Sequence, residues 1–354
     1  MLCQIKSPFV FSVEQLDREL IARGAQIPRE ERLKFLDMEG TPIRNDVMAS
    51  IEELYSTAPI LDETMCHLSI QDIIEMLIEQ TIKEKHVKGI WLKDDRLDYY
   101  EIEDEQIKKN ADCVAAVCMK NNLVDMKNGF SEIEVKNFGR TFNLCQREPF
   151  HHHPTAAGPM CSGFLVKEDT IATAAHFVHE NNLKDLCFVF GFKMVDISTP
   201  VIQLPNENIY KGIEIVDRKY NDKVNGADWA LVKLDRRVFG QTVAKLSEKA
   251  ISNHYPAYVL GHPMGLPLKF APGICLDDVN DACFSAQLDM YSGNSGSPIF
   301  DGNTHEAIGI VVRGYQKDLR CTGKCWISVI YPKHDICSKS PQCTRVSEFI
   351  HVCK

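Results

Sequence analysis

The sequence has no hydrophobic run that approaches the roughly 20 apolar residues required to cross a membrane. Its start, Met1 to Gln15, also lacks the long apolar stretch and the small-residue cleavage site of a secretory signal. These two absences predict a chain that neither enters a membrane nor leaves the cell. We therefore expect a cytoplasmic location.

The chain also lacks an excess of positive charge. Its 40 Lys and Arg residues are outnumbered by 49 Asp and Glu residues, which gives a formal net charge of −9. A general nucleic-acid binder needs a basic face to neutralise phosphates. The charge balance therefore argues against nucleic acid as a partner.

Cysteine is plentiful, with 14 residues, but the paired Cys-x2-Cys spacing of a strong zinc site is missing. Structural thiols or a disulfide are the favoured interpretation, and zinc is the alternative. Five of these cysteines lie near the end of the chain: Cys321, Cys325, Cys337, Cys343 and Cys353. His151, His152 and His153 are consecutive, so their side chains diverge, and we interpret them as an exposed loop rather than a metal site. No metal or cofactor is expected.

At 354 residues the chain is long enough for two domains, since single cores stop growing near 250–300 residues. Residues 1–92 show helical patterning. The clearest helix begins near Ser69 and carries apolar residues at helical spacing at Ile70, Ile73, Ile74, Leu77, Ile78 and Ile82. We predict a small helical bundle over 1–92. It is either a stabilising extension or an adaptor or regulatory domain with a protein partner of its own.

The second expected domain covers residues 93–354, and from Cys113 onward its pattern changes to strands. Short apolar runs at Cys113–Cys118, Leu186–Phe190 and Ala257–Leu260 are separated by turn signals. This rhythm is typical of antiparallel barrels. The expected fold of this region is therefore mainly β, in two barrels.

Three short segments carry chemistry: Thr173–His176, Ala227–Val232 and Gly293–Pro298. They place a histidine, an aspartate and a serine in that order along the chain. A serine hydroxyl is a weak nucleophile unless an imidazole accepts its proton, and a carboxylate fixes the tautomer of that imidazole. Taken singly, the same residues also fit a core histidine, a strand-capping aspartate and a turn serine.

From about Arg96 to the C-terminus the chain resembles the bacterial trypsin-like serine peptidases of the chymotrypsin fold, in their glutamyl-endopeptidase-like branch. The His–Asp–Ser order is that of chymotrypsin. The other segments that carry the resemblance are Cys161–Val166, Leu260–Lys269, Ile308–Gly314 and Thr344–Ile350, the last of which resembles the start of the C-terminal helix. The resemblance implies two six-stranded antiparallel β-barrels, preceded here by the helical bundle.

The resemblance also implies roles for single residues. Ser295 corresponds to the nucleophile, His176 to the general base and Asp228 to the orienting carboxylate. The backbone N–H groups of Gly293 and Ser295 correspond to the oxyanion hole. The implied activity is that of a serine endopeptidase acting on protein or peptide substrates. The alternative is a weak or inactive relative that binds peptides or acts as a scaffold through its helical domain.

Three residues are candidates for substrate binding. Asp289, six residues before Ser295, corresponds to the base of the primary pocket of trypsin, or it is a structural acid. Arg313 and Gly314 lie on the strand that lines the substrate cleft in the family. Arg313 could neutralise Asp289 or favour an acidic substrate residue, so the sequence leaves basic and acidic preferences open.

One position departs from the secreted trypsin-like zymogens, in which a newly cut N-terminal ammonium pairs with an aspartate directly before the serine. That position is Asn294 here, and it carries no charge. We therefore expect activation without that ion pair, and control from elsewhere in the chain.

Overall fold

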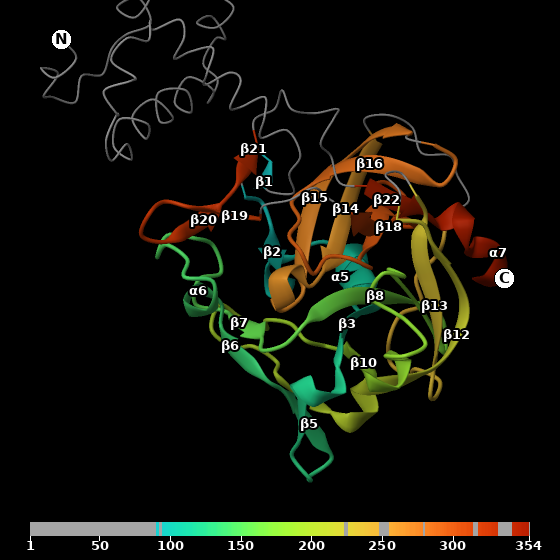
Figure 1. Cartoon of the computed structure of the whole chain (residues 1–354), viewed down its shortest axis with the longest axis horizontal. Coiled ribbons are helices and arrows are strands. Elements are labelled where there is room, and N and C mark those ends of the chain that lie inside the picture. Colours follow the sequence, from blue (N-terminus) through green and yellow to red (C-terminus); the bar gives the residue numbers. More distant parts are fainter. Residues whose placement is uncertain are drawn as a thin grey trace, which may run out of the picture. The chain divides into compact units, whose positions relative to one another are not determined.

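The computed structural model describes residues 90–91, 94–222, 226–247, 255–278, 280–313, 318–331 and 342–353 (Figure 1). The chain divides into two units, 1–84 and 85–354, and all described residues belong to the second. The bundle expected over 1–92 thus lies outside the described residues except at its end. There Ile90–Trp91 form a short strand, β1, instead of a helix.

The first barrel is closed and antiparallel, with the strand order β10-β12-β13-β9-β8-β3. The strands are β3 (Val114–Met119), β8 (Met160–Lys167), β9 (Thr170–Thr173), β10 (Leu186–Phe190), β12 (Ile209–Tyr220) and β13 (Asp228–Leu234). All five residues of β10 are buried, and Cys187 and Val189 lie in a second apolar cluster with Ile133 and Leu204.

The second barrel has the order β14-β17-β18-β22-β16-β15 and is closed by pairing between β14 and β15. Its strands are β14 (Tyr255–Gly261), β15 (Lys269–Asp278), β16 (Cys283–Leu288), β17 (Pro298–Asp301), β18 (Ala307–Arg313) and β22 (Gln342–Arg345). A further strand, β2 (Leu97–Asp98), pairs with β15 from outside the ring, with Asp98 opposite Lys269. The expectation of two six-stranded barrels is confirmed.

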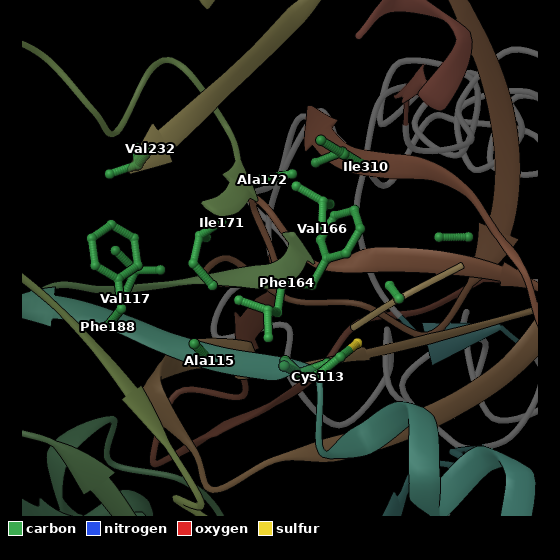
Figure 2. Packing of buried hydrophobic residues seen from close by; sticks show 14 of the residues in the cluster. Cys113, Ala115, Val117, Phe164, Val166, Ile171, Ala172, Phe188, Val232 and Ile310 are labelled. Atoms are coloured by element: carbon green, nitrogen blue, oxygen red, sulfur yellow. The ribbon is translucent and has the colours of Figure 1, made fainter. Parts of the chain in front are cut away.

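One apolar cluster runs through the first barrel and into the second. It contains Phe164 and Val166 of β8 and also Ile310 of β18 (Figure 2). Burial of apolar surface contributes about 25 cal/mol per Å², so this shared core resists separation of the two barrels. The loops between the barrels are therefore presented on a common support.

The remaining elements are short. The small strands are β4 (Leu123–Asp125), β5 (Phe130–Ile133), β6 (Val135–Asn137), β7 (Pro154–Ala156), β11 (Gln203–Pro205), β19 (Leu319–Cys321), β20 (Trp326–Ser328) and β21 (Ile330–Tyr331). Three α-helices occur among the described residues: α5 (Glu105–Ala111), α6 (Phe138–Thr141) and α7 (Ile350–Cys353). Short 3₁₀ turns lie at Tyr99–Glu101, Lys120–Asn122, Leu183–Asp185, Asn206–Asn208, Pro263–Gly265 and Val346–Glu348. In the described part of the chain, no helix has both the length and the apolar character of a membrane span.

Two local details differ from the expectations. The segment Thr344–Ile350 does not begin as a helix, because Gln342–Arg345 pair with β16 and β18 as the strand β22. The α-helix starts only at Ile350. In addition, α5 precedes the first barrel strand, and its N-terminus is capped by Asp104, which accepts hydrogen bonds from the N–H groups of Gln106 and Ile107.

Candidate active site

His176 and Asp228 come together at one end of the first barrel. The His176 Nδ1 lies 2.8 Å from Asp228 Oδ2, and the His176 backbone N–H donates to Asp228 Oδ1 at 3.1 Å. The two bonds fix both the ring and the backbone of the histidine against one carboxylate. A carboxylate on Nδ1 holds that nitrogen protonated and leaves Nε2 as the basic atom.

The turn that carries His176 follows β9 directly. Arg218 of β12 holds this turn by donating to the carbonyl oxygens of Ala175 at 3.0 Å and Val178 at 3.1 Å. The His176 side chain is 33% exposed, whereas that of Asp228 is fully buried. The imidazole is thus accessible from outside while its carboxylate partner is shielded from water.

Asp228 is the first residue of β13, and partners from the second barrel surround it. Its N–H donates to the Thr344 hydroxyl of β22 at 3.0 Å. The guanidinium of Arg313, at the end of β18, lies 3.5 Å from Asp228 Oδ2. The carboxylate is therefore placed by both barrels, although its strand belongs to the first.

Ser295 lies in the loop between β16 and β17, and β8 of the first barrel holds this loop. The Ser162 N–H donates to the Ser295 carbonyl at 2.9 Å, and the Cys161 thiol donates to the same oxygen at 2.9 Å. The Ser162 hydroxyl donates to the Gly293 carbonyl at 3.2 Å. Two carbonyl groups of the loop are thus fixed by consecutive residues of one strand.

The turn after β14 fixes the peptide before Gly293. The Met264 N–H donates to the Ser292 carbonyl at 2.5 Å. Because a trans peptide directs its C=O and N–H to opposite sides, the Gly293 N–H points away from this turn. Among the described residues, neither the Gly293 N–H nor the Ser295 N–H donates a hydrogen bond. Both donors remain available for a ligand oxygen.

Glycine is required at position 293 for steric reasons. Its φ is +93°, and a Cβ built there would lie 2.8 Å from both the His262 carbonyl and the Met264 nitrogen. Those two backbone atoms cannot yield as a flexible side chain could. The backbone course that frees the Gly293 N–H therefore depends on the missing side chain.

The Ser295 hydroxyl makes no hydrogen bond within the described part of the chain, to His176 or to any other group. Candidate catalytic pairs are often long or poorly aligned without substrate. The Ser295 loop is bonded to β8, and β8 pairs with β9, the strand that leads to His176, but no hydrogen bond joins Ser295 to His176 among the described residues. Their roles as nucleophile, base and orienting acid stay predictions.

Asp289 is buried beside the segment that precedes β2. It is 4% exposed, and the Asp95 N–H donates to its Oδ2 at 3.4 Å. Burial raises the pKa of the neighbouring Asp95 carboxyl, against the lowering effect of its hydrogen bond to Asp289. Asp289 thus contacts the segment before β2, and both interpretations of Asp289 left open by the sequence stay predictions.

Arg313 contacts the loop before β13. Its Nη1 donates to the Gly226 carbonyl at 2.6 Å, and its Nη2 donates to the Asn221 carbonyl. Together with its ion pair to Asp228, these contacts bring Arg313 to the candidate triad. Gly314 lies outside the described residues, so its predicted place on the cleft-lining strand stays a prediction.

The three consecutive histidines do not share one environment, so the exposed-loop interpretation holds only for His152. His153 is largely buried, with Nδ1 3.3 Å from Lys269 Nζ, and burial lowers its pKa to about 4. The burial of Lys269 itself lowers its pKa to about 8, despite its ion pair with Asp98. The described residues contain no group of three or more His, Cys, Asp or Glu placed to hold a metal ion.

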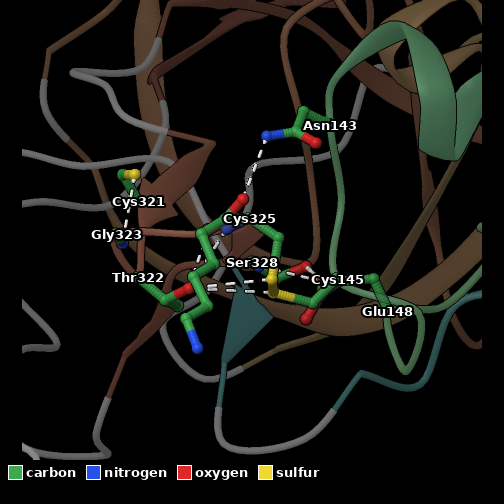
Figure 3. Close-up of a disulfide and its surroundings, with 9 residues drawn as sticks. Asn143, Cys145, Glu148, Cys321, Thr322, Gly323, Cys325 and Ser328 are labelled. Carbon is green, nitrogen blue, oxygen red and sulfur yellow. Dashed lines mark hydrogen bonds between the residues drawn. A yellow bond between two sulfur atoms is a disulfide. The ribbon is translucent and has the colours of Figure 1, made fainter.

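A disulfide joins Cys145 to Cys325 beside the second barrel (Figure 3). Next to it, Glu148 accepts hydrogen bonds from the Ser328 N–H at 2.9 Å and from the Ser328 hydroxyl. The Ser328 hydroxyl in turn accepts a bond from Tyr291 of the loop that leads to Ser295. Nine further cysteines of the described region form no disulfide; eight of them are at least partly buried, and Cys321 is exposed. This fits the expectation of structural thiols with a disulfide.

Three residues of the site have contacts that the sequence pattern does not predict, although Ser162 and Thr344 lie in segments that carry the family resemblance. Ser162, Arg218 and Thr344 act through contacts between elements far apart in the chain, and each is an ordinary strand residue by pattern. The segment Leu260–Lys269 carries part of the family resemblance, but its His262 takes no part in the candidate triad. It is 1% exposed, contacts the Leu266 carbonyl through Nδ1 at 3.1 Å, and burial lowers its pKa to about 4.

Comparison with known proteins agrees with this fold. The family model described as a trypsin-like peptidase domain matches residues 161–310, a stretch that includes His176, Asp228 and Ser295. The expected resemblance to trypsin-like peptidases is thereby confirmed over this stretch of the chain. None of the curated protein sequences matches the chain.

Three solved structures are similar at low identity. A scabies mite inactivated protease paralogue, S-I1, shares 15% identity with a TM-score of 0.42, and the alignment covers 69% of this chain and 93% of that one. A Glu endopeptidase in complex with MPD shares 14% identity at a TM-score of 0.44, over 75% and 99% of the two chains. The inactive Ser343Ala form of Rv3671c from M. tuberculosis shares 11% identity at a TM-score of 0.41, over 75% and 94%.

Proposed function

We propose that this chain is a serine endopeptidase that cleaves protein or peptide substrates through an acyl-enzyme. The observation that carries the proposal is the His176 Nδ1–Asp228 Oδ2 contact of 2.8 Å, in a chain whose serine loop leaves two N–H donors free among the described residues. The matched peptidase domain supports it at the level of fold.

In the proposed mechanism, the Ser295 oxygen attacks the scissile carbonyl carbon while His176 Nε2 takes the hydroxyl proton. The carbonyl oxygen becomes an oxyanion between the N–H groups of Gly293 and Ser295. The C–N bond then breaks, and His176 returns the proton to the leaving amine. A water molecule repeats the sequence on the acyl-enzyme and releases the acid.

Asp228 contributes by its burial. Because its carboxylate is excluded from water, it stabilises the imidazolium formed during proton transfer more strongly than an exposed acid would. Arg313 and Gly314 remain our candidates for contact with the substrate. Asp289 remains a weaker candidate, since its described contact is with Asp95.

The experiment is a cleavage profile of the purified full-length chain on a peptide library, with Ser295→Ala as the matched control. We expect cleavage by the wild type only. Peptide binding without cleavage would contradict the proposal and favour the inactive peptide-binding alternative. The profile also decides between basic and acidic preference at the primary pocket.

Control or recruitment through residues 1–92 stays a prediction, because those residues lie outside the described ones apart from the short strand β1. A pull-down with a fusion of residues 1–92, against the same fusion with Ile73 and Leu77 replaced by Asp, tests it. A partner retained only by the native sequence supports an adaptor role. Equal recovery with both fusions supports a stabilising extension.

A further inference from the structure

The segment Asp94–Arg96 lies against the loop that leads to Ser295. It immediately precedes β2, whose pairing with β15 fixes its position on the second barrel. Arg96 is a cation at 5% exposure, and a charge is buried in a folded protein only when it is paired and hydrogen-bonded. The burial of Arg96 therefore calls for specific partners.

The partners of Arg96 are an acid and two aromatic rings. Its Nε and Nη2 donate to the two carboxylate oxygens of Asp94 at 2.9 and 2.7 Å. Its guanidinium carbon lies 4.1 Å from the centroid of the Tyr291 ring and 5.0 Å from that of Phe150. Burial opposes the charge, but Tyr291, Asp94 and Asp289 more than offset it, and the pKa of Arg96 is raised.

Tyr291 connects this cation to the serine loop. It lies four residues before Ser295, and its carbonyl accepts the Asn294 N–H at 3.1 Å. Its hydroxyl is fixed by Ser328, and its ring is covered by the Arg96 guanidinium. Two residues earlier, Asp289 accepts the Asp95 N–H. The segment Asp94–Arg96 thus holds the loop at Asp289 and at Tyr291.

The side chain of Asn294 is bonded within its own loop rather than to an ammonium group. It is 2% exposed, and its Oδ1 accepts the Ser297 hydroxyl at 3.2 Å. It offers no carboxylate to a new N-terminal ammonium. The cation that contacts the loop in this chain is internal, and it acts on Tyr291 through a ring face.

We propose that Arg96 is a positioning residue that holds Tyr291, and through it the Gly293 and Ser295 donors, in a competent arrangement in the uncut chain. The proposal rests on the proposed function and specifies how that site is assembled. It explains how a chain with asparagine at position 294 forms its oxyanion hole without proteolytic activation. Arg96 touches neither substrate nor reacting atoms in this account.

The test uses the uncut full-length chain, with kcat and KM measured on a peptide that the wild type cleaves. Active sites are counted from the burst with a fluorophosphonate, so that kcat refers to competent molecules. Arg96→Met keeps the apolar stem and removes the charge, and Arg96→Lys keeps the charge. Arg140→Met is the matched control, because Arg140 is exposed on α6.

We expect Arg96→Met to lower kcat per counted site by about 10²-fold, the scale of a lost oxyanion donor, with KM nearly unchanged. Arg96→Lys should recover most of that loss, and Arg140→Met should match the wild type. A normal kcat per site in Arg96→Met, with only fewer sites, would overturn the proposal, because it describes a stability role alone.

A double-mutant cycle covers the case in which Arg96→Met folds poorly. Tyr291→Leu removes the ring beneath the guanidinium, and the cycle pairs it with Arg96→Gln, which removes the charge but keeps an N–H donor for Asp94. If Arg96 acts through Tyr291, the two losses in kcat overlap and the double variant is no worse than Tyr291→Leu. Fully additive losses would contradict the proposal. Absence of burst and cleavage in the wild type would instead refute the proposed function.

Discussion

The two barrels contribute to the candidate site in different ways. The first barrel presents His176 and Asp228 as side chains bonded directly to each other at 2.8 Å. The second presents Ser295 on a loop whose shape depends on backbone groups, held by Ser162, Met264 and the Asp94–Arg96 segment. The first half thus has a direct bond between its two functional side chains, in addition to its support from Arg218, Arg313 and Thr344, whereas the second rests on contacts from other segments alone. The first half should tolerate distant change, and the second should be sensitive to it.

The largest expected effect comes from removing a triad side chain, and it should be the same for either half of the site. Ser295→Ala and His176→Ala should each lower kcat by about 10⁶, because nucleophile and base act as a unit. The double variant should be no worse than either single variant. Both proteins should keep the wild-type thermal unfolding midpoint within a few degrees. Cleavage by Ser295→Ala at the wild-type rate would refute the triad.

The second effect comes from a change in the Ser295 loop alone, which belongs to the second barrel. Gly293→Ala should lower kcat by about 10²–10³, since the added Cβ meets the His262 and Met264 backbone and displaces an oxyanion donor. Gly129→Ala is the matched control, because Gly129 has a φ of +88° but open space around it. Equal activity of the two variants would show that the tight backbone packing around Gly293 is not needed for activity.

The third effect concerns the disulfide, which lies next to the Glu148 and Ser328 contacts that fix Tyr291 in the loop before Ser295. Cys145 and Cys325 are 180 residues apart, so their bond constrains a long loop of the unfolded chain. Reduction should lower the free energy of unfolding by about 5 kcal/mol and lower kcat modestly through Glu148 and Ser328. Thermal unfolding with and without reductant measures this. The thermal unfolding of the Cys145→Ser/Cys325→Ser variant should not change with reductant. If reductant destabilises this variant as much as the wild type, the effect comes from other thiols.

The smallest effect concerns the turn that fixes Ser292. Burial lowers the pKa of His262 from 6.5 to about 4, so the unfolded chain binds a proton that the folded chain rejects between these values. Stability is therefore full above pH 6.5 and falls toward pH 4, by about 3 kcal/mol for a shift of this size. Denaturant unfolding at pH 7 and pH 4.5 measures the loss. His262→Gln should reduce this pH dependence, and an unchanged dependence would assign it to other groups such as His153.

The sequence predicts the first half of the site better than the second. His176 and Asp228 flank recognisable strands, and closing those strands into one barrel brings the two residues together. The barrel strands themselves were foreseeable from short apolar runs, and β10 has the expected bounds. The interpretation of Thr344–Ile350 as a helix start is wrong for Thr344–Arg345, because strand pairing with β16 and β18 overrides local propensity there, and helical structure follows from Val346.

The second half depends on pairings that no local pattern encodes. Ser162 and Met264 hold the serine loop from other strands and turns, and Arg96 reads as a surface charge until the fold buries it beneath Tyr291. Asp289 was recognised by its position, but its partner Asp95 lies 194 residues away in the sequence. The side chains that shape the loop could therefore be identified only from the structure.

The most direct test of the account is the reaction of the uncut full-length chain with a fluorophosphonate, with the adduct located by mass spectrometry. The account predicts that the Ser295 oxygen bonds to phosphorus, that fluoride leaves and that His176 takes the proton. The adduct should be absent from His176→Ala. A folded wild-type chain that forms no adduct at Ser295, or forms one only after cleavage near residues 150–160, would contradict the account.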